Sequence, residues 1–126
     1  MWNLSFACNE ITEISEITNL INLKNLYLQC NKIQYLPSSI GYLISMIDLG
    51  LESNNLRDLP LSIINLVNLC YLNISNNPIY NLHPVTWNFI NNINIHNFYK
   101  DSQNVYTSSI QECVKQSIIK IVDFRY

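Results

Sequence analysis

The stretch LYLQCNKIQYLPSSIGYL, from Leu26 to Leu43, returns in altered form 23 residues later, where Leu49 takes the place of Leu26. The second copy reads LGLESNNLRDLPLSIINL and ends at Leu66. Both share the order Leu-x-Leu-x-x-Asn-x-apolar-x-x-Leu-Pro-x-x-Ile-x-x-Leu. Self-similarity at a period of roughly 20–50 residues indicates stacked units that bury their apolar side chains against one another. The spacing of these apolar residues therefore decides the architecture.

Weaker copies of the pattern flank this pair. The first begins at Leu4, 22 residues before the pair, and has Ile-Ser where Leu-Pro would stand. The fourth begins at Leu72 and has Leu-His-Pro at that place. Ile93 and Ile95 then mark a fifth strand. We therefore predict one repeat domain over residues 1–98, with about four repeats and a fifth strand.

Each position of the pattern has a physical role. Alternating apolar residues at the start of each repeat predict a short strand with one buried face. Strands one period apart pair in parallel, so each return segment lies outside the sheet. Pro37 and Pro60 cannot donate to a sheet, which favours irregular return segments. An asparagine side chain can satisfy turn amides, and four of them follow the strands as a predicted ladder: Asn9, Asn31, Asn54 and Asn77.

The repeated string resembles the leucine-rich repeat. Its 23-residue Leu-Pro form is similar to the intracellular, Ras-binding-type repeats of scaffold proteins, and less similar to the shorter repeats of bacterial secreted effectors. The resemblance implies an α/β fold, a right-handed solenoid with a parallel sheet on its concave side. It also implies a protein partner bound on that concave face, whose residues vary freely between members of the family.

A different pattern follows the repeats. Ser109 and Glu112 have the spacing of a helix capping box, and apolar residues then recur at helical spacing. We predict a C-terminal cap over residues 99–126, with an amphipathic helix from about residue 109 that covers the last repeat. A partner-binding or membrane-surface helix is the alternative, and the membrane version is disfavoured because few lysines accompany it.

The first repeat has no predicted cover. Its apolar side chains, among them Leu4, Phe6 and Ile11, would face an open edge of the sheet. An open apolar edge is a template for pairing with another chain. Three explanations stay open: self-association through this end, a partner that covers it, or a chain shortened from a longer repeat protein.

Composition argues against several classes of partner and location. Charged residues make up 13 % of the 126 residues and the formal net charge is −2, so nucleic acid is not expected as a partner. Apolar runs are short and no leader pattern is visible, so we expect neither membrane association nor secretion. The four cysteines have no metal-ligand spacing. This favours reduced thiols in the cytoplasm, of the organism itself or of a host cell.

No catalytic pattern stands out. A thiol nucleophile would need Cys70 or Cys113 beside His83 or His96, and no spacing supports such a pair. The chain has two glycines, too few for a glycine-rich phosphate loop. We therefore predict a non-enzymatic protein with no cofactor and no metal.

The outward strand positions form the candidate binding surface, because they alternate with the buried leucines. Gly50 leaves a dent that we expect tyrosines of the flanking repeats to frame, and tyrosine rings are enriched at recognition sites. An ordinary polar sheet face is the competing interpretation. Cys8 and Cys30 precede successive ladder asparagines, where we expect half-buried packing rather than a disulfide. The residues predicted to bind an unidentified protein partner are Tyr27, Gln29, Asp48, Glu52, Tyr71 and Asn73.

Overall fold

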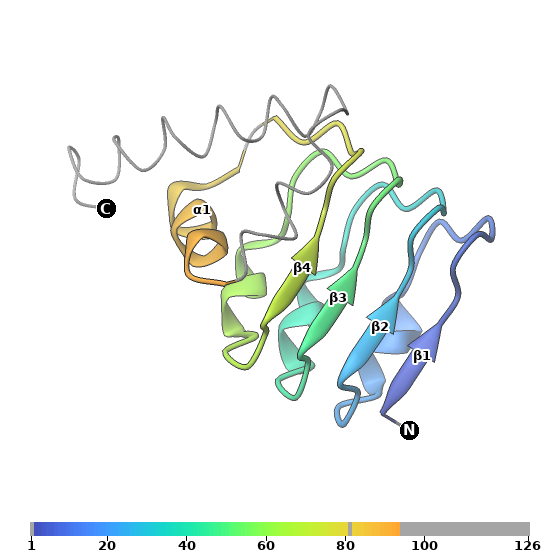
Figure 1. Cartoon of the computed structure of the whole chain (residues 1–126), viewed down its shortest axis with the longest axis horizontal. Helices are drawn as coiled ribbons and strands as arrows, with labels where there is room; N and C mark the ends of the chain where they lie inside the picture. The colour runs from blue at the N-terminus through green and yellow to red at the C-terminus, as the bar shows by residue number, and fades with distance from the viewer. Residues whose placement is uncertain (1, 81, 94–126) are drawn as a thin grey trace.

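The repeats form one parallel sheet in the computed structural model, which describes residues 2–80 and 82–93. Figure 1 shows the strands side by side, with the return segments behind them. The register pairs Leu26 with Leu4 and Leu49, and Leu49 with Leu72. This confirms the period predicted from the sequence. In spatial order the strands are β1 (Asn3–Ser5), β2 (Asn25–Tyr27), β3 (Asp48–Gly50) and β4 (Tyr71–Asn73).

Each of the first three return segments contains one short 3-10 helix. Pro37 and Pro60 stand directly before the second and third of these helices, with φ of −68° and −66°. A proline ring holds φ in this range, and its missing N–H is no loss where a helix begins. The prediction that these segments lie outside any sheet is confirmed. The three helices are η1 (Ser15–Asn19), η2 (Ser38–Tyr42) and η3 (Leu61–Asn65).

The fourth return segment is an α-helix, α1 (Pro84–Asn91), which packs on η3. Pro84 occupies its first turn, and His83 Nδ1 accepts a hydrogen bond from the Val85 N–H at 3.1 Å. The Trp87 side chain is 4 % exposed and joins the core. None of the helices within residues 2–80 and 82–93 has the length and apolar content needed to cross a bilayer.

Part of the sequence-based prediction lies beyond these elements. Ile93 follows α1 in a bend rather than in a strand. Ile95, the other residue predicted for a fifth strand, and the predicted cap over residues 99–126 lie outside the described residues.

One apolar core runs between the sheet and the return segments. Leu26 and Leu49 enter it from the strands, and Ile40 and Ile63 enter it from η2 and η3; all four are fully buried. Burying an aliphatic side chain stabilises a fold by roughly 1.5–3 kcal/mol. Since each side chain is covered partly by the next repeat, the stability of the fold comes from stacking.

The predicted asparagine ladder ties the strand ends together. The Leu28 carbonyl accepts Nδ2–H hydrogen bonds from Asn31 at 3.0 Å and from Asn54, one repeat later, at 2.9 Å. The Leu51 carbonyl is shared in the same way by Asn54 at 3.1 Å and Asn77 at 2.9 Å. Each shared carbonyl therefore joins two repeats, and the prediction of a ladder is confirmed.

The residue before each ladder asparagine has a left-handed backbone. Its φ is 58° at Cys8, 60° at Cys30, 58° at Ser53 and 56° at Asn76. This conformation costs most non-glycine residues about 1–2 kcal/mol, and Asn tolerates it better. The thiols of Cys8 and Cys30 are free and exposed, so the prediction of half-buried packing is wrong. The left-handed turn places these side chains outside the core.

We predict that Asn54→Ala destabilises the fold more than Asn9→Ala. The Oδ1 atom of Asn54 accepts the buried Ile33 N–H at 3.1 Å, and leaving that group unpaired costs about 1–3 kcal/mol. Asn9 is exposed and donates to the carbonyls of Phe6 and Ala7, so its loss should cost under about 1 kcal/mol. Urea unfolding followed by circular dichroism measures both changes. Equal losses would contradict the stabilising role of the buried ladder.

Candidate functional site

Outward side chains of β2, β3 and β4 surround one hollow on the concave face, the face formed by the strands in Figure 1. Its volume is about 240 Å³. The structure brings all the residues singled out in the sequence around this one hollow. The lining residues are Tyr27, Gln29, Asp48, Gly50, Glu52, Tyr71 and Asn73.

Tyr27 reaches from β2 across β3. Its hydroxyl donates a hydrogen bond of 2.8 Å to Asp48 Oδ2. Its Cδ1 atom lies 3.3 Å from the point where a Cβ on Gly50 would stand, so the glycine leaves the room that the ring occupies. The register pairs Gly50 with Tyr27 and Asn73, whereas Tyr71 pairs with Asp48. Both tyrosines line the hollow that contains Gly50, but only Tyr27 lies directly beside the glycine, whereas Tyr71 pairs with Asp48.

A second hydrogen-bond network orients Glu52. Asn73 Nδ2 donates to Glu52 Oε2 at 2.7 Å. The Oδ1 atom of Asn73 accepts the Ser75 N–H at 3.1 Å and the Ser75 hydroxyl at 2.7 Å. These two donors hold the amide so that its nitrogen faces the carboxylate. Both carboxylates of the hollow thus receive a hydrogen bond from a neutral donor on a neighbouring repeat.

Gln29 supplies an acceptor that lacks a donor. Its Oε1 atom is shielded from solvent and has no hydrogen-bond partner among residues 2–80 and 82–93. This atom lies 3.5 Å from the Cβ point of Gly50, and Glu52 Oε1 lies 3.4 Å from the same point. Two acceptor oxygens therefore approach the bare backbone of Gly50. Shielded acceptors are normally paired, so the hollow suits a group that donates hydrogen bonds.

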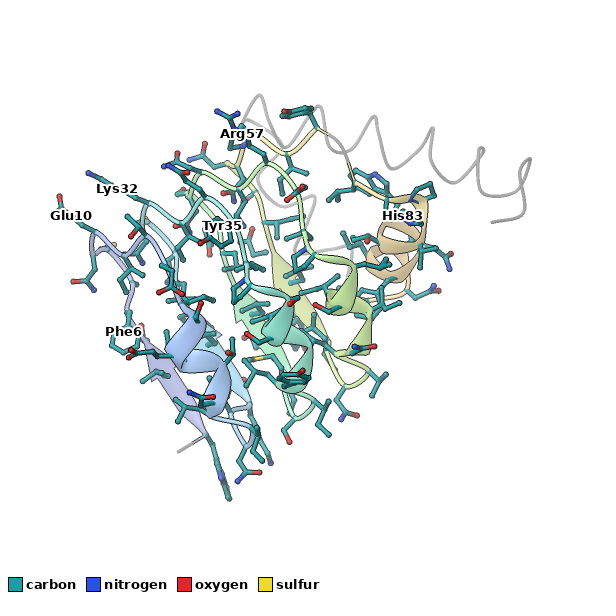
Figure 2. All side chains as sticks on the ribbon, turned by 180° about the vertical axis from the view of Figure 1, so that it is seen from behind. Phe6, Glu10, Lys32, Tyr35, Arg57 and His83 are labelled. Carbon is teal, nitrogen blue, oxygen red and sulfur yellow. The ribbon has the colours of Figure 1, made fainter. Side chains whose placement is uncertain are left out.

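A second hollow, of about 400 Å³, lies on the loops that follow the strands. We call these loops the rim. Figure 2 shows Tyr35 and Arg57, which line this hollow. Glu10 and Lys32 lie farther along the rim, and their charged atoms are 3.6 Å apart. Sequence reasoning missed the rim because its residues occupy the variable loop positions of the repeat, which have no periodic signal. Within the described part of the chain, no side-chain hydrogen bond joins the lining residues. These are Gln34, Tyr35, Asn55, Arg57 and Pro78.

Groups that could support catalysis are dispersed in the described residues. No three His, Cys, Asp or Glu side chains there could share a metal ion. The imidazole of His83 accepts the hydrogen bond that caps α1. The exposed thiol of Cys70 donates to the Asn68 carbonyl at 3.5 Å. Cys113 and His96 lie outside the described residues.

We predict that Asp48→Asn lowers the titration midpoint of Tyr27. The hydrogen bond to Asp48 raises the pKa of the Tyr27 phenol above its ordinary value of 10.0, and partial burial and the negative charge of Asp48 act in the same direction. Because the pKa of Tyr27 is higher in the folded chain than in the unfolded chain, the hydrogen bond to Asp48 stabilises the fold fully at pH values below the unfolded pKa. This stabilisation is lost as the pH rises through the pKa of Tyr27 in the folded chain. ¹³C NMR of the tyrosine Cζ atoms measures the midpoint.

Asp58→Asn is the control for this titration, because Asp58 is exposed and lies on a loop away from the hollow. It should leave the midpoint of Tyr27 unchanged. An unchanged midpoint in the Asp48 variant would show that the hydrogen bond does not set the pKa.

No family model matches the sequence, and no curated protein matches it. Among solved structures, a leucine-rich repeat protein of Leptospira interrogans has a TM-score of 0.67 and 32 % identity over 75 % of this chain. The chain spans 24 % of the length of that protein. An internalin of Listeria monocytogenes is 17 % identical, with a TM-score of 0.36, over 71 % of this chain and 38 % of its own. The repeats and the asparagine ladder of the present chain, together with its likeness to the Leptospira protein, show that the chain belongs to the leucine-rich repeat family.

Proposed function

We propose that this chain is a non-enzymatic interaction module that binds a protein partner through its concave strand face. The observation that carries the proposal is the hollow between β2 and β4, to which side chains of three successive repeats contribute. These side chains point away from the core, so packing alone does not require them. Leucine-rich repeat proteins generally serve as interaction modules, which supports the same conclusion.

Two tyrosines give the face its anchors. Tyr71 is 43 % exposed, so a large amphipathic ring is available to a partner. Tyr27 is held in place by its hydrogen bond to Asp48. A side chain that is already ordered loses little conformational entropy when a partner binds, which favours affinity.

The hollow is smaller than a whole interface. Stable protein–protein contacts bury about 800 Å² on each partner, so we expect the partner to extend along the outward positions of all the strands.

The exposed thiols of Cys8, Cys30 and Cys70 favour a reducing compartment such as the cytoplasm for this encounter.

We predict that the triple variant Tyr27→Ala, Glu52→Ala, Tyr71→Ala loses a partner that the wild-type chain retains. The substitutions remove both rings and one of the two carboxylates and leave the buried leucines untouched. Loss of a hot-spot aromatic residue typically weakens binding by about 2 kcal/mol or more. Affinity capture from a lysate, followed by mass spectrometry, compares the two chains, and circular dichroism checks that the variant is folded.

A matched control removes two tyrosines and one acid elsewhere. Tyr42, Asp58 and Tyr80 are exposed, with Tyr42 on η2 and the other two on the loops that follow the strands. The triple alanine variant at these positions should capture the same partner as the wild type. Capture that is lost only in this control, or retained in the concave variant, would refute binding through the concave face.

Self-association through β1 is the second candidate. Phe6 is 36 % exposed, whereas the residues at its position in the next two repeats, Leu28 and Leu51, are 0 % exposed. β1 is also one of the two edge strands of the described sheet. An edge strand beside exposed apolar side chains can pair with a second copy of the same chain.

For this candidate we predict that molar mass rises with protein concentration and that Phe6→Lys abolishes the rise. A lysine at the edge places a charge where a second strand would have to pack. Multi-angle light scattering across a concentration series makes the measurement. A strict monomer in the wild-type chain at every concentration would eliminate this candidate.

A further inference from the structure

Charge on the four described strands of the concave face has one sign. Within the strand segments, residues 3–7, 25–29, 48–52 and 71–75, the charged residues are Asp48 and Glu52, and Lys, Arg and His are absent. Lys24 lies just before β2, and its Nζ is 4.8 Å from the ring centroid of Trp2. A partner group that enters the hollow therefore meets negative charge, which selects for a cation.

Hydrogen-bond acceptors gather in the hollow while neighbouring donors are already engaged. The Tyr27 hydroxyl donates to Asp48, and Asn73 Nδ2 donates to Glu52. Gln29 Oε1 accepts no hydrogen bond from the described residues although it is shielded from solvent. A ligand that matches this set must bring several N–H donors together with its positive charge.

The volume of the hollow and its aromatic lining restrict the class of ligand further. The hollow of about 240 Å³ is smaller than the roughly 300–1,000 Å³ of typical small-molecule sites. It therefore suits one side chain rather than a whole metabolite. The Tyr71 ring is exposed beside Asp48, and aromatic faces attract cations. A planar guanidinium can stack on such a ring while its N–H groups reach acceptors on several sides.

We propose that this hollow binds one arginine side chain of the protein partner, with the guanidinium between Asp48 and Glu52. The inference rests on the proposed function and names the group that the concave face recognises. One edge of the guanidinium faces the Asp48 carboxylate and another faces Glu52 and Gln29 Oε1, close to the bare backbone of Gly50. Guanidinium–carboxylate hydrogen bonds are short, strong and directional, so they favour arginine over lysine here.

The test titrates ¹⁵N-labelled full chain with three capped peptides of glycine and serine that differ only at the central residue. That residue is arginine, lysine or citrulline, which keeps the shape of arginine without its charge. We expect saturable NMR shifts with the arginine peptide at the Gly50 amide and at the side-chain amides of Gln29 and Asn73. The lysine peptide should bind at least about fivefold more weakly, because a compact ammonium cannot reach every acceptor. The citrulline peptide should produce no saturable shift.

Isosteric substitutions then remove one charge at a time. Asp48→Asn and Glu52→Gln should each weaken binding of the arginine peptide by about tenfold, since each loses a charge-assisted hydrogen bond. Glu13→Gln lies outside the strand segments and should leave the affinity unchanged. The ¹⁵N spectrum itself shows that each variant is folded. Equal binding of arginine and citrulline, equal binding of arginine and lysine, or shifts that avoid Gly50 would each overturn the assignment.

The two proposals fail in different ways. If the partner captured from a lysate depends on the concave face but no arginine peptide binds there, the arginine site is wrong and the interaction function stands. If the concave triple alanine variant keeps the captured partner, the interaction function fails, whatever the peptides do.

Discussion

Directly after β1, β2 and β3 lies a backbone carbonyl that accepts hydrogen bonds from two asparagine side chains, one in its own repeat and one in the next. The Leu28 and Leu51 carbonyls are shared in this way by Asn31, Asn54 and Asn77. A chain that turns off a sheet inside a core must satisfy its backbone groups without water. The shared carbonyl meets that requirement. It also makes successive repeats leave the sheet at equivalent positions, so the strands stack in register.

The in-register stack creates the concave hollow. Tyr27 and Asp48 are 21 residues apart in sequence, yet their side chains share a 2.8 Å hydrogen bond because β2 lies beside β3. Asn73 reaches Glu52 across the next strand pair for the same reason. Since tyrosine and asparagine are neutral donors, they orient the two carboxylates without cancelling their charge. The result is a hollow lined by two carboxylates that are oriented by neighbouring repeats.

The ladder asparagine is exposed in the first repeat, which has no preceding strand in the described sheet. Asn9 is exposed, whereas Asn31, Asn54 and Asn77 are buried. Phe6 is likewise exposed at a position that is fully buried in the following repeats. The side chains are of the same kind in each case, so burial depends on the preceding repeat and not on the residue alone. The opposite end differs again, because α1 takes the place of a 3-10 helix and brings Trp87 into the core.

The sequence alone determined the repeat period, the buried leucines, the ladder asparagines and the outward positions of the strands. These follow from local periodicity, because a strand alternates its faces and a stacked repeat must return the same residue types to the same place. Tertiary structure decided which outward side chains meet. Tyr27 lies over Gly50, Tyr71 stands beside Asp48 and Gln29 keeps an unmatched acceptor, and each outcome depends on register and side-chain direction between repeats. The exposure of Cys8 and Cys30 and the α-helical fourth return segment were likewise decided there, since a left-handed turn and a histidine cap act through backbone geometry that apolar periodicity does not encode.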